Sequence, residues 1–215
     1  MKIRFLGHSS FLITSEKGVK IITDPYKAGC FGGGIKYAPI NEEADIVTIS
    51  HEHDDHNSTE ISGNPTFVRG VGAKQLKGIE INGFEVFHDE CGGAERGKNT
   101  VFKMNIDGVS VVHLGDIGHQ LSDEEIQRIG KVDILFIPVG GYFTIDATTA
   151  ESIAAKLMPR IIVPMHFKTK GCGFPIAPVD DYIKNKEVKT CDGEFEITKE
   201  NLPEKMMTYV LNPTK

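Results

Sequence analysis

The feature that most constrains this chain is the segment SHEHDDHN at residues 50–57. It places three imidazoles and three carboxylates in the six residues from His51 to His56, directly after a largely apolar run at 44–49. Three histidines this close repel one another when protonated, whereas neutral imidazole with ionised carboxylate is a ligand set that divalent transition metals prefer. The segment therefore predicts a metal centre on a loop at the end of a strand.

Short runs rich in β-branched and aromatic residues indicate that strands dominate the fold and that helices follow singly. We expect strands at 2–6, 10–14, 19–23, 45–49, 66–68, 132–139, 161–163, 194–198 and 206–211, and hairpins across Asn82-Gly83 and Asp107-Gly108. One helical turn is expected at 72–76, and helices at 122–130, 146–157 and 178–184. Acidic residues and histidines recur where these strands end.

The whole-chain properties narrow the class of protein. A length of 215 residues suits one domain over 1–215, and a net charge of -6 argues against nucleic acid or an anionic membrane as partner. The chain has no apolar run long enough for a membrane span, and its first residues lack the pattern of a secretory signal, so a cytoplasmic location is expected. Its four cysteines form no CxxC pair and are interpreted as free thiols. The oligomeric state is left open, with a homo-oligomer as one option.

The spacing inside the histidine segment predicts two metal sites. Alternate residues of an extended segment point the same way, so His51 and His53 can share one metal, and Asp55 and His56 then turn towards a second. Two divalent ions roughly 3.5 to 4 Å apart can hold a hydroxide between them and lower its pKa into the physiological range. Such a loop needs further ligands from elsewhere. Later strand ends offer the side chains His88, Asp116 and His166.

The motifs IRFLGHSSFLI, ITDP, SHEHDDHN, FHD, HLGDIGH and IVPMHF follow one another in this order. Together they resemble the metallo-β-lactamase fold superfamily, in particular its small lactonase-like metal-dependent hydrolases. The resemblance implies an α/β fold, a four-layer αβ/βα sandwich of two mixed sheets flanked by helices, with two divalent metal ions at one edge. Zinc is the first expectation, with manganese or iron as alternatives.

Carried over residue by residue, the resemblance implies a full ligand set. The first metal would be held by His51, His53 and His88, the second by Asp55, His56 and His166, with Asp116 bridging them.

Other polar residues near these motifs have competing interpretations. His113 competes with His88 as a ligand, and we favour His88 because a polar loop follows it. His8 is interpreted as a turn or packing residue, and His119 is equally well a residue near the metals or one that precedes the helix. Asp24 is expected to support a ligand imidazole by a hydrogen bond.

The expected activity is hydrolysis of a small ester, lactone, amide or phosphoester by a metal-bridging hydroxide. Asp55 and Asp116 are the candidate catalytic residues, because either could orient the nucleophile or handle a proton. Two alternatives stay open: an iron-dependent oxidoreductase on the same fold, and a phosphodiesterase acting on nucleotides.

The substrate is expected to be a small molecule, and an anionic one is compatible with the sequence. Four cations follow the proposed ligands in the chain, namely Arg96, Lys98, Lys168 and Lys170. They could hold a carboxylate or phosphate, but a solvated surface role has comparable weight.

Overall fold

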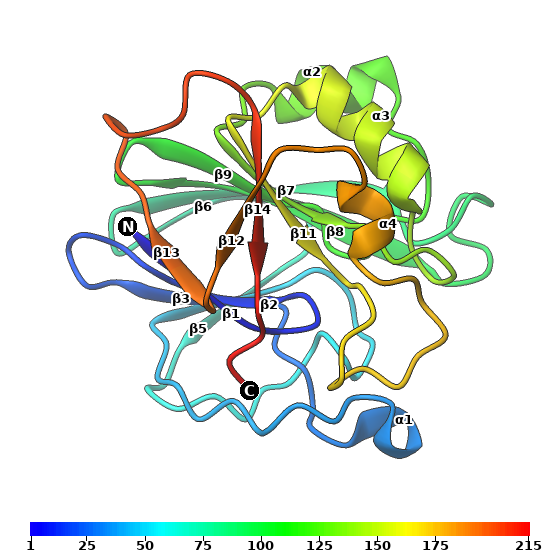
Figure 1. Ribbon diagram of the computed structural model, residues 1–215. Coiled ribbons are helices and arrows are strands. Elements are labelled where there is room, and N and C mark those ends of the chain that lie inside the picture. Colours follow the sequence, from blue (N-terminus) through cyan, green and yellow to red (C-terminus); the bar gives the residue numbers. More distant parts are fainter.

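Two mixed β-sheets pack face to face in the computed structural model, which describes residues 1–215 (Figure 1). The six-stranded sheet has the order β13 (Glu194–Glu196), β1 (Lys2–Gly7), β2 (Ser10–Thr14), β3 (Lys20–Thr23), β4 (Ile46–Ile49) and β5 (Thr66–Arg69). The eight-stranded sheet has the order β12 (Val188–Cys191), β14 (Met207–Leu211), β11 (Ile161–Met165), β10 (Ile134–Pro138), β9 (Val109–His113), β8 (Lys98–Ile106), β7 (Ile79–Phe87) and β6 (Gly72–Leu76).

The main core lies between the sheets, and the alternation of side chains along each strand creates it. In β2, Phe11 and Ile13 point into this core, whereas Leu12 points to the opposite face of the six-stranded sheet. Phe11 stacks on Phe136 of β10 with ring centroids 4.2 Å apart. This aromatic contact joins the two sheets directly.

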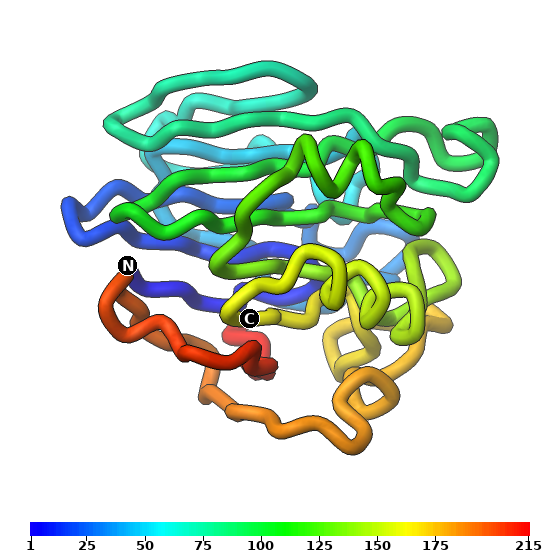
Figure 2. The backbone as a smooth tube through the Cα atoms, turned by 90° about the horizontal axis from the view of Figure 1, so that it is seen from above, coloured from blue at the N-terminus to red at the C-terminus, as the bar shows by residue number.

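The outer face of the eight-stranded sheet is covered by α2 (Asp123–Ile129), α3 (Ala147–Leu157) and α4 (Asp180–Ile183). The coils of α2 and α3 lie in front of the strands in Figure 2. The predicted capping box begins α2, since the Ser122 hydroxyl accepts from the backbone N–H of Glu125 and the Glu125 carboxylate accepts in return. None of the helices has the length and apolar character needed to span a membrane.

The outer face of the six-stranded sheet is covered by the long connection between β3 and β4. This connection carries the short α1 (Cys30–Gly33), and it packs Tyr26, Ile35 and Tyr37 into a second, smaller core beneath the sheet. The predicted α/β sandwich of two mixed sheets is confirmed, with this fourth layer made mostly of irregular chain.

Two local predictions between residues 72 and 87 were wrong. Residues 72–76 form strand β6 instead of a helical turn, and Asn82-Gly83 lies inside the continuous strand β7 instead of at a hairpin turn. The turn is at Lys77-Gly78, where φ is +49° and +82°. Gly83 has a packing role instead, because a Cβ there would overlap the carbonyl oxygen of Gly70. The strand β12 was not predicted at all.

The direction of the strands brings the predicted site residues to one edge of the sandwich. The strands β9, β10 and β11 are parallel, and β7 runs in the same direction because two antiparallel pairings separate it from β9. In the other sheet β3 and β4 are also parallel. The carboxyl ends of β7, β9 and β11 therefore carry His88, Asp116 and His166 to the same edge.

Candidate metal centre

All seven predicted ligands meet at this edge, together with His8 from the turn between β1 and β2. Seven of these eight side chains form two groups. In each group every residue offers one possible ligand atom, and these atoms lie within 4.8 Å of one another. The outer group is His51, His53 and His88, and the inner group is His8, Asp55, His56 and His166. All of these residues are buried except His53, which is half-buried.

Asp116 lies between the two groups. Its Oδ2 atom is 3.1 Å from Nε2 of His56 and 3.2 Å from Nε2 of His166, both in the inner group. The same oxygen is 3.5 Å from Nε2 of His88 and 3.9 Å from Nε2 of His51, both in the outer group. A single carboxylate oxygen is thus close to four imidazole nitrogens.

His8 takes a larger part in the site than the sequence indicated. Its Nε2 lies 3.0 Å from Oδ2 of Asp55, and its ring centroid lies 4.1 Å from that of His166. The backbone of His8 has φ of +57°, a left-handed conformation that non-glycine residues adopt infrequently. Only the Gly7-His8 pair hints at this turn in the sequence, and it says nothing about which distant side chain the imidazole meets.

Asp24, at the end of β3, orients one histidine of each group. Its carboxylate accepts hydrogen bonds from Nδ1 of His56 at 2.9 Å and from the Ser50 hydroxyl at 2.5 Å. The Ser50 oxygen in turn lies 2.9 Å from Nδ1 of His51. With Nδ1 of both rings carrying the proton, Nε2 is left as the free lone pair, which is the form that binds a metal. The expected hydrogen bond from Asp24 to a ligand imidazole is therefore present.

The other two uncertain histidines have partners that keep them out of the site. His113 lies with Nε2 2.9 Å from the backbone oxygen of Ser9, and its Nδ1 accepts from the N–H of Gly115. His119 accepts from the N–H of Phe87 and donates to the oxygen of Gln120. Both nitrogens of each ring are occupied, so neither histidine offers a free lone pair.

The charges and unpartnered atoms of the site fit divalent cations. The carboxylates of Asp24, Asp55 and Asp116 are all buried, and their ion pairs are to histidines alone, with no lysine or arginine. Buried charges need compensation. Several buried polar atoms here lack any hydrogen-bond partner, namely Nε2 of His51, His56 and His166 and Oδ1 of Asp116. Nitrogen and carboxylate donors left open in this way are suited to a transition metal.

Burial keeps His51 and His88 neutral in the metal-free protein. Burial lowers the pKa of His51 to about 3 and the pKa of His88 to about 4. Burial also opposes charge on His56, but the carboxylates of Asp116 and Asp55 outweigh it and raise the His56 pKa well above its ordinary value. For Asp116, His166 and His56 overcome the effect of burial and hold the carboxyl pKa well below its ordinary value.

The loop after β7 is held in shape by Asp89, a residue to which the sequence gave no role. Its carboxylate accepts four backbone hydrogen bonds of 2.7 to 2.9 Å, from Cys91, Gly93, Glu95 and Arg96. These hydrogen bonds lower the pKa of Asp89 to about 2. On its other side, the backbone of His88 is in such close contact with Gly118 that a Cβ at 118 would overlap it. The position of His88 is thereby fixed from both sides.

A pocket of about 230 Å³ opens onto both groups. Its walls contain three phenylalanines and one cation in addition to site residues, and the full lining is Phe31, His53, Asp55, His88, Arg96, Asp116, Phe143, His166 and Phe174. Of the four cations considered from the sequence, Lys98 pairs with Glu85 at 2.9 Å and Lys168 donates to the backbone oxygen of Phe174. Only Arg96 lines the pocket. The three phenylalanines of the pocket wall were not predicted from the sequence.

The comparisons with known proteins agree with this fold. The family model of the beta-lactamase superfamily domain matches residues 2–166. The chain therefore belongs to the metallo-β-lactamase superfamily and is an enzyme of its metal-dependent hydrolase class, as its motifs predicted.

Within that superfamily, a UPF0173 metal-dependent hydrolase of Thermococcus onnurineus is 30% identical over 79% of this chain and 85% of its own length. A solved structure from Thermotoga maritima, assigned as a Zn-dependent hydrolase of the metallo-beta-lactamase superfamily, is 34% identical with a TM-score of 0.81. That match covers 98% of this chain and 99% of the other. The diiron β-hydroxylase CmlA of Streptomyces venezuelae shares the fold at 17% identity and a TM-score of 0.52, over 77% of this chain and 44% of its own.

Proposed function

We propose that the protein is a dinuclear hydrolase that cleaves a small ester, lactone, amide or phosphoester. The outer group, His51, His53 and His88, would hold one divalent ion. Asp55, His56 and His166 of the inner group would hold the other, and Asp116 would bridge the two. The observation that carries the proposal is the position of Asp116 Oδ2, within 3.9 Å of histidine nitrogens from both groups.

Divalent ions bound here would supply Lewis acidity, which lowers the pKa of water and polarises a carbonyl or phosphoryl oxygen. The residues of the chain have three further tasks. Asp24 and Ser50 keep His51 and His56 in the tautomer that leaves Nε2 free. His8 holds Asp55 by a hydrogen bond. Asp55 and Asp116 border the pocket, where each can take a proton from the attacking water or return one to the leaving group.

Zinc is the proposed metal, because imidazoles and carboxylates bind it and the related Thermotoga maritima protein is assigned as Zn-dependent. The same donors suit iron and manganese. The fold shared with a diiron hydroxylase makes an iron-dependent oxidoreductase the second candidate.

The test begins with metal analysis of protein purified without added metal. The zinc-, manganese- and iron-loaded forms are then each assayed against aryl esters, lactones, thioesters and phosphodiesters. We expect about two ions per chain and turnover of at least one hydrolytic substrate without a redox partner. Iron as the native metal, with no hydrolysis in any loaded form, would contradict the proposal and favour the oxidoreductase.

A further inference from the structure

The aromatic wall of the pocket is contributed by three segments that are distant in the sequence. Phe31 lies in α1, Phe143 follows β10, and Phe174 follows β11. The ring centroids of Phe31 and Phe143 lie 5.7 and 5.4 Å from that of Phe174, and both pairs are close to perpendicular. Such edge-to-face pairs form an apolar surface that suits a flat group.

Phe31 is unusual because it is 57% exposed and has φ of +51°. An exposed phenylalanine gains little from folding, and the left-handed conformation costs about 1 kcal/mol or more in a residue with a Cβ. The core does not require this side chain. Its position at the pocket instead suits contact with a bound molecule.

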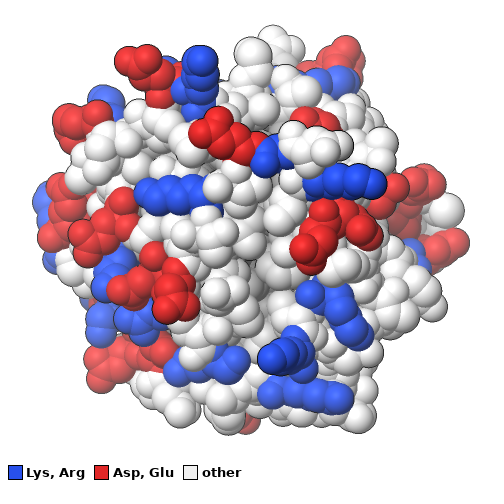
Figure 3. Space-filling model, viewed as in Figure 1, with Lys and Arg blue, Asp and Glu red and all other residues white.

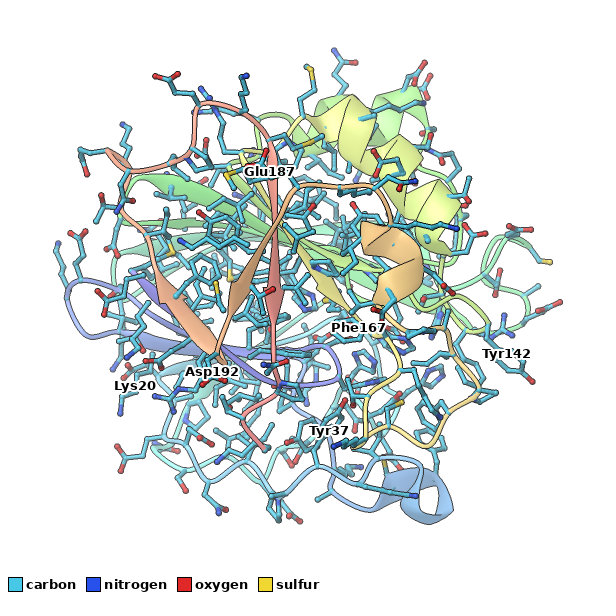
Figure 4. All side chains as sticks on the ribbon, in the orientation of Figure 1. Lys20, Tyr37, Tyr142, Phe167, Glu187 and Asp192 are labelled. Carbon is cyan, nitrogen blue, oxygen red and sulfur yellow. The ribbon has the colours of Figure 1, made fainter.

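The wall is preformed, because the segments of Phe31 and Phe174 are tied together. The backbone N–H of Lys36 donates to Gly171 at 2.8 Å, and the N–H of Gly173 donates to Gly34 at 2.7 Å. The Tyr37 hydroxyl lies 2.5 Å from that of Thr169. Tyr37 is labelled near these segments in Figure 4, and Tyr142, next to Phe143, is labelled at the outer edge.

Arg96 is the one cationic side chain in the pocket lining. Its guanidinium carbon lies 5.9 Å from the ring centroid of Phe143, and its backbone N–H is held by Asp89. Its ion pair is with the exposed Glu95 at 3.5 Å, a contact worth little in water. The guanidinium is therefore available for a carboxylate or phosphate, which it can bind through two parallel hydrogen bonds. The face of the molecule shown in Figure 3 carries charges of both signs.

We propose that the substrate is a small anion with a flat apolar group. The apolar group would lie against Phe31, Phe143 and Phe174, the anionic group would meet Arg96, and the scissile bond would lie beside Asp116. A volume of about 230 Å³ is below the 300 to 1,000 Å³ of pockets for drug-sized ligands, so the group is of the size of one ring. This inference names the substrate class and rests on the proposed hydrolase function.

The test measures the binding of three probes to the zinc-loaded protein by calorimetry. Phenylphosphonate has a ring and an anion, methylphosphonate has the anion alone, and benzyl alcohol has the ring without the charge. We expect phenylphosphonate to bind about tenfold more tightly than methylphosphonate, because burial of one ring contributes that much or more. It should also bind about tenfold more tightly than benzyl alcohol, which lacks the charge that would pair with Arg96. The two phosphonates carry the same anionic group, so the ratio of their affinities isolates the contribution of the ring.

Two variants, each with a matched control, test whether Arg96 binds the anionic group and Phe31 binds the ring. Arg96→Gln should weaken both phosphonates about tenfold and leave benzyl alcohol unchanged. Arg128→Gln should change nothing, although Arg128 also lies over a ring, that of Phe84, at 5.8 Å. Phe31→Ala should reduce the preference for the phenyl over the methyl probe. The control Met158→Ala should not, although Met158 is also exposed with positive φ.

Equal binding of the two phosphonates, or unchanged phosphonate binding in Arg96→Gln, would overturn the inference. A hydrolysis screen on the same samples separates it from the proposed function. Probe preference without any hydrolysis would leave the pocket assignment standing and remove the hydrolase proposal. Hydrolysis without probe preference would support the hydrolase proposal and remove the pocket assignment.

Discussion

The outer and inner groups of the metal centre are built in different ways. The outer group takes two of its three histidines from one loop, and one of them, His53, is half-buried at the pocket. The inner group takes its members from the β1–β2 turn, the histidine loop and the end of β11, and all are buried. The outer site therefore depends mainly on one segment, whereas the inner site depends on the whole fold. We expect an ion in the outer group to exchange more readily.

The largest effect is expected from Asp116→Ala, which removes the residue common to both groups. Turnover of a substrate found in the screen should fall about 10²- to 10⁴-fold, the range for loss of a group that handles a proton, and both ions should bind less tightly. Circular dichroism should show an unchanged fold. Full turnover in this variant would exclude the bridging role.

Asp24→Asn tests whether the two groups share one support. In Asp24, Oδ2 accepts from His56 and from the Ser50 hydroxyl, and Oδ1 accepts from the Ser50 backbone N–H. Asparagine fills the same space, but its NH2 group cannot accept and its negative charge is lost, so the affinity for both ions should fall about 10- to 100-fold. Competition with a chelator measures this. Asp45→Asn is the control, because Asp45 also accepts a backbone N–H, from Lys20, but lies outside both groups. Loss of only one ion would mean that the support is not shared.

The pH dependence of the metal-free protein tests the burial of neutral histidines. His51, with a pKa of about 3, and His8 and His88, each about 4, titrate near 6.5 when unfolded. Between pH 6.5 and pH 4 the unfolded chain therefore binds more protons than the folded chain. The free energy of unfolding should decrease as the pH is lowered through this range, by about 1.4 kcal/mol per pH unit for each histidine. His56 has a raised pKa in the folded protein, so its contribution has the opposite sign. Above pH 6.5 it decreases the free energy of unfolding as the pH rises.

Urea unfolding in the presence of a chelator, repeated at several pH values, measures this slope. A free energy of unfolding that stays flat or rises on acidification from pH 6.5 to pH 4.5 would be inconsistent with buried neutral rings.

The smallest change is expected from His53→Ala, which should reduce the metal content from about two ions to about one per chain with little loss of thermal stability. His166→Ala removes a fully buried ring, so it should lower both the metal content and the melting temperature. Elemental analysis and calorimetry on the two variants compare the groups directly. Equal effects of the two substitutions would remove the distinction between outer and inner.

The position of the candidate ligands at strand ends was predictable, because apolar runs and the order of motifs are visible in the local sequence. His88, Asp116 and His166 each follow a strand whose apolar run is visible in the sequence, so their convergence needed only the parallel arrangement. The choice of His88 over His113 also agrees with the geometry, since His113 has both nitrogens occupied.

The features that the sequence did not predict depend on contacts between distant segments. Asn82-Gly83 has the composition of a hairpin turn, but the close approach of Gly70 gives the glycine a packing role inside β7. The contact of His8 with Asp55 joins residues 47 positions apart. The three phenylalanines of the pocket have no common spacing, so no pattern in the chain groups them.

The four backbone hydrogen bonds accepted by Asp89 have a consequence for how this enzyme could acquire new substrates. They fix the course of the 88–97 loop without using the side chains of Glu95 or Arg96. Those two side chains can therefore be exchanged while the loop and His88 keep their places. Selection, natural or in a directed library, could therefore change the substrate preference through substitutions at positions 95 and 96 while the metal centre stays the same.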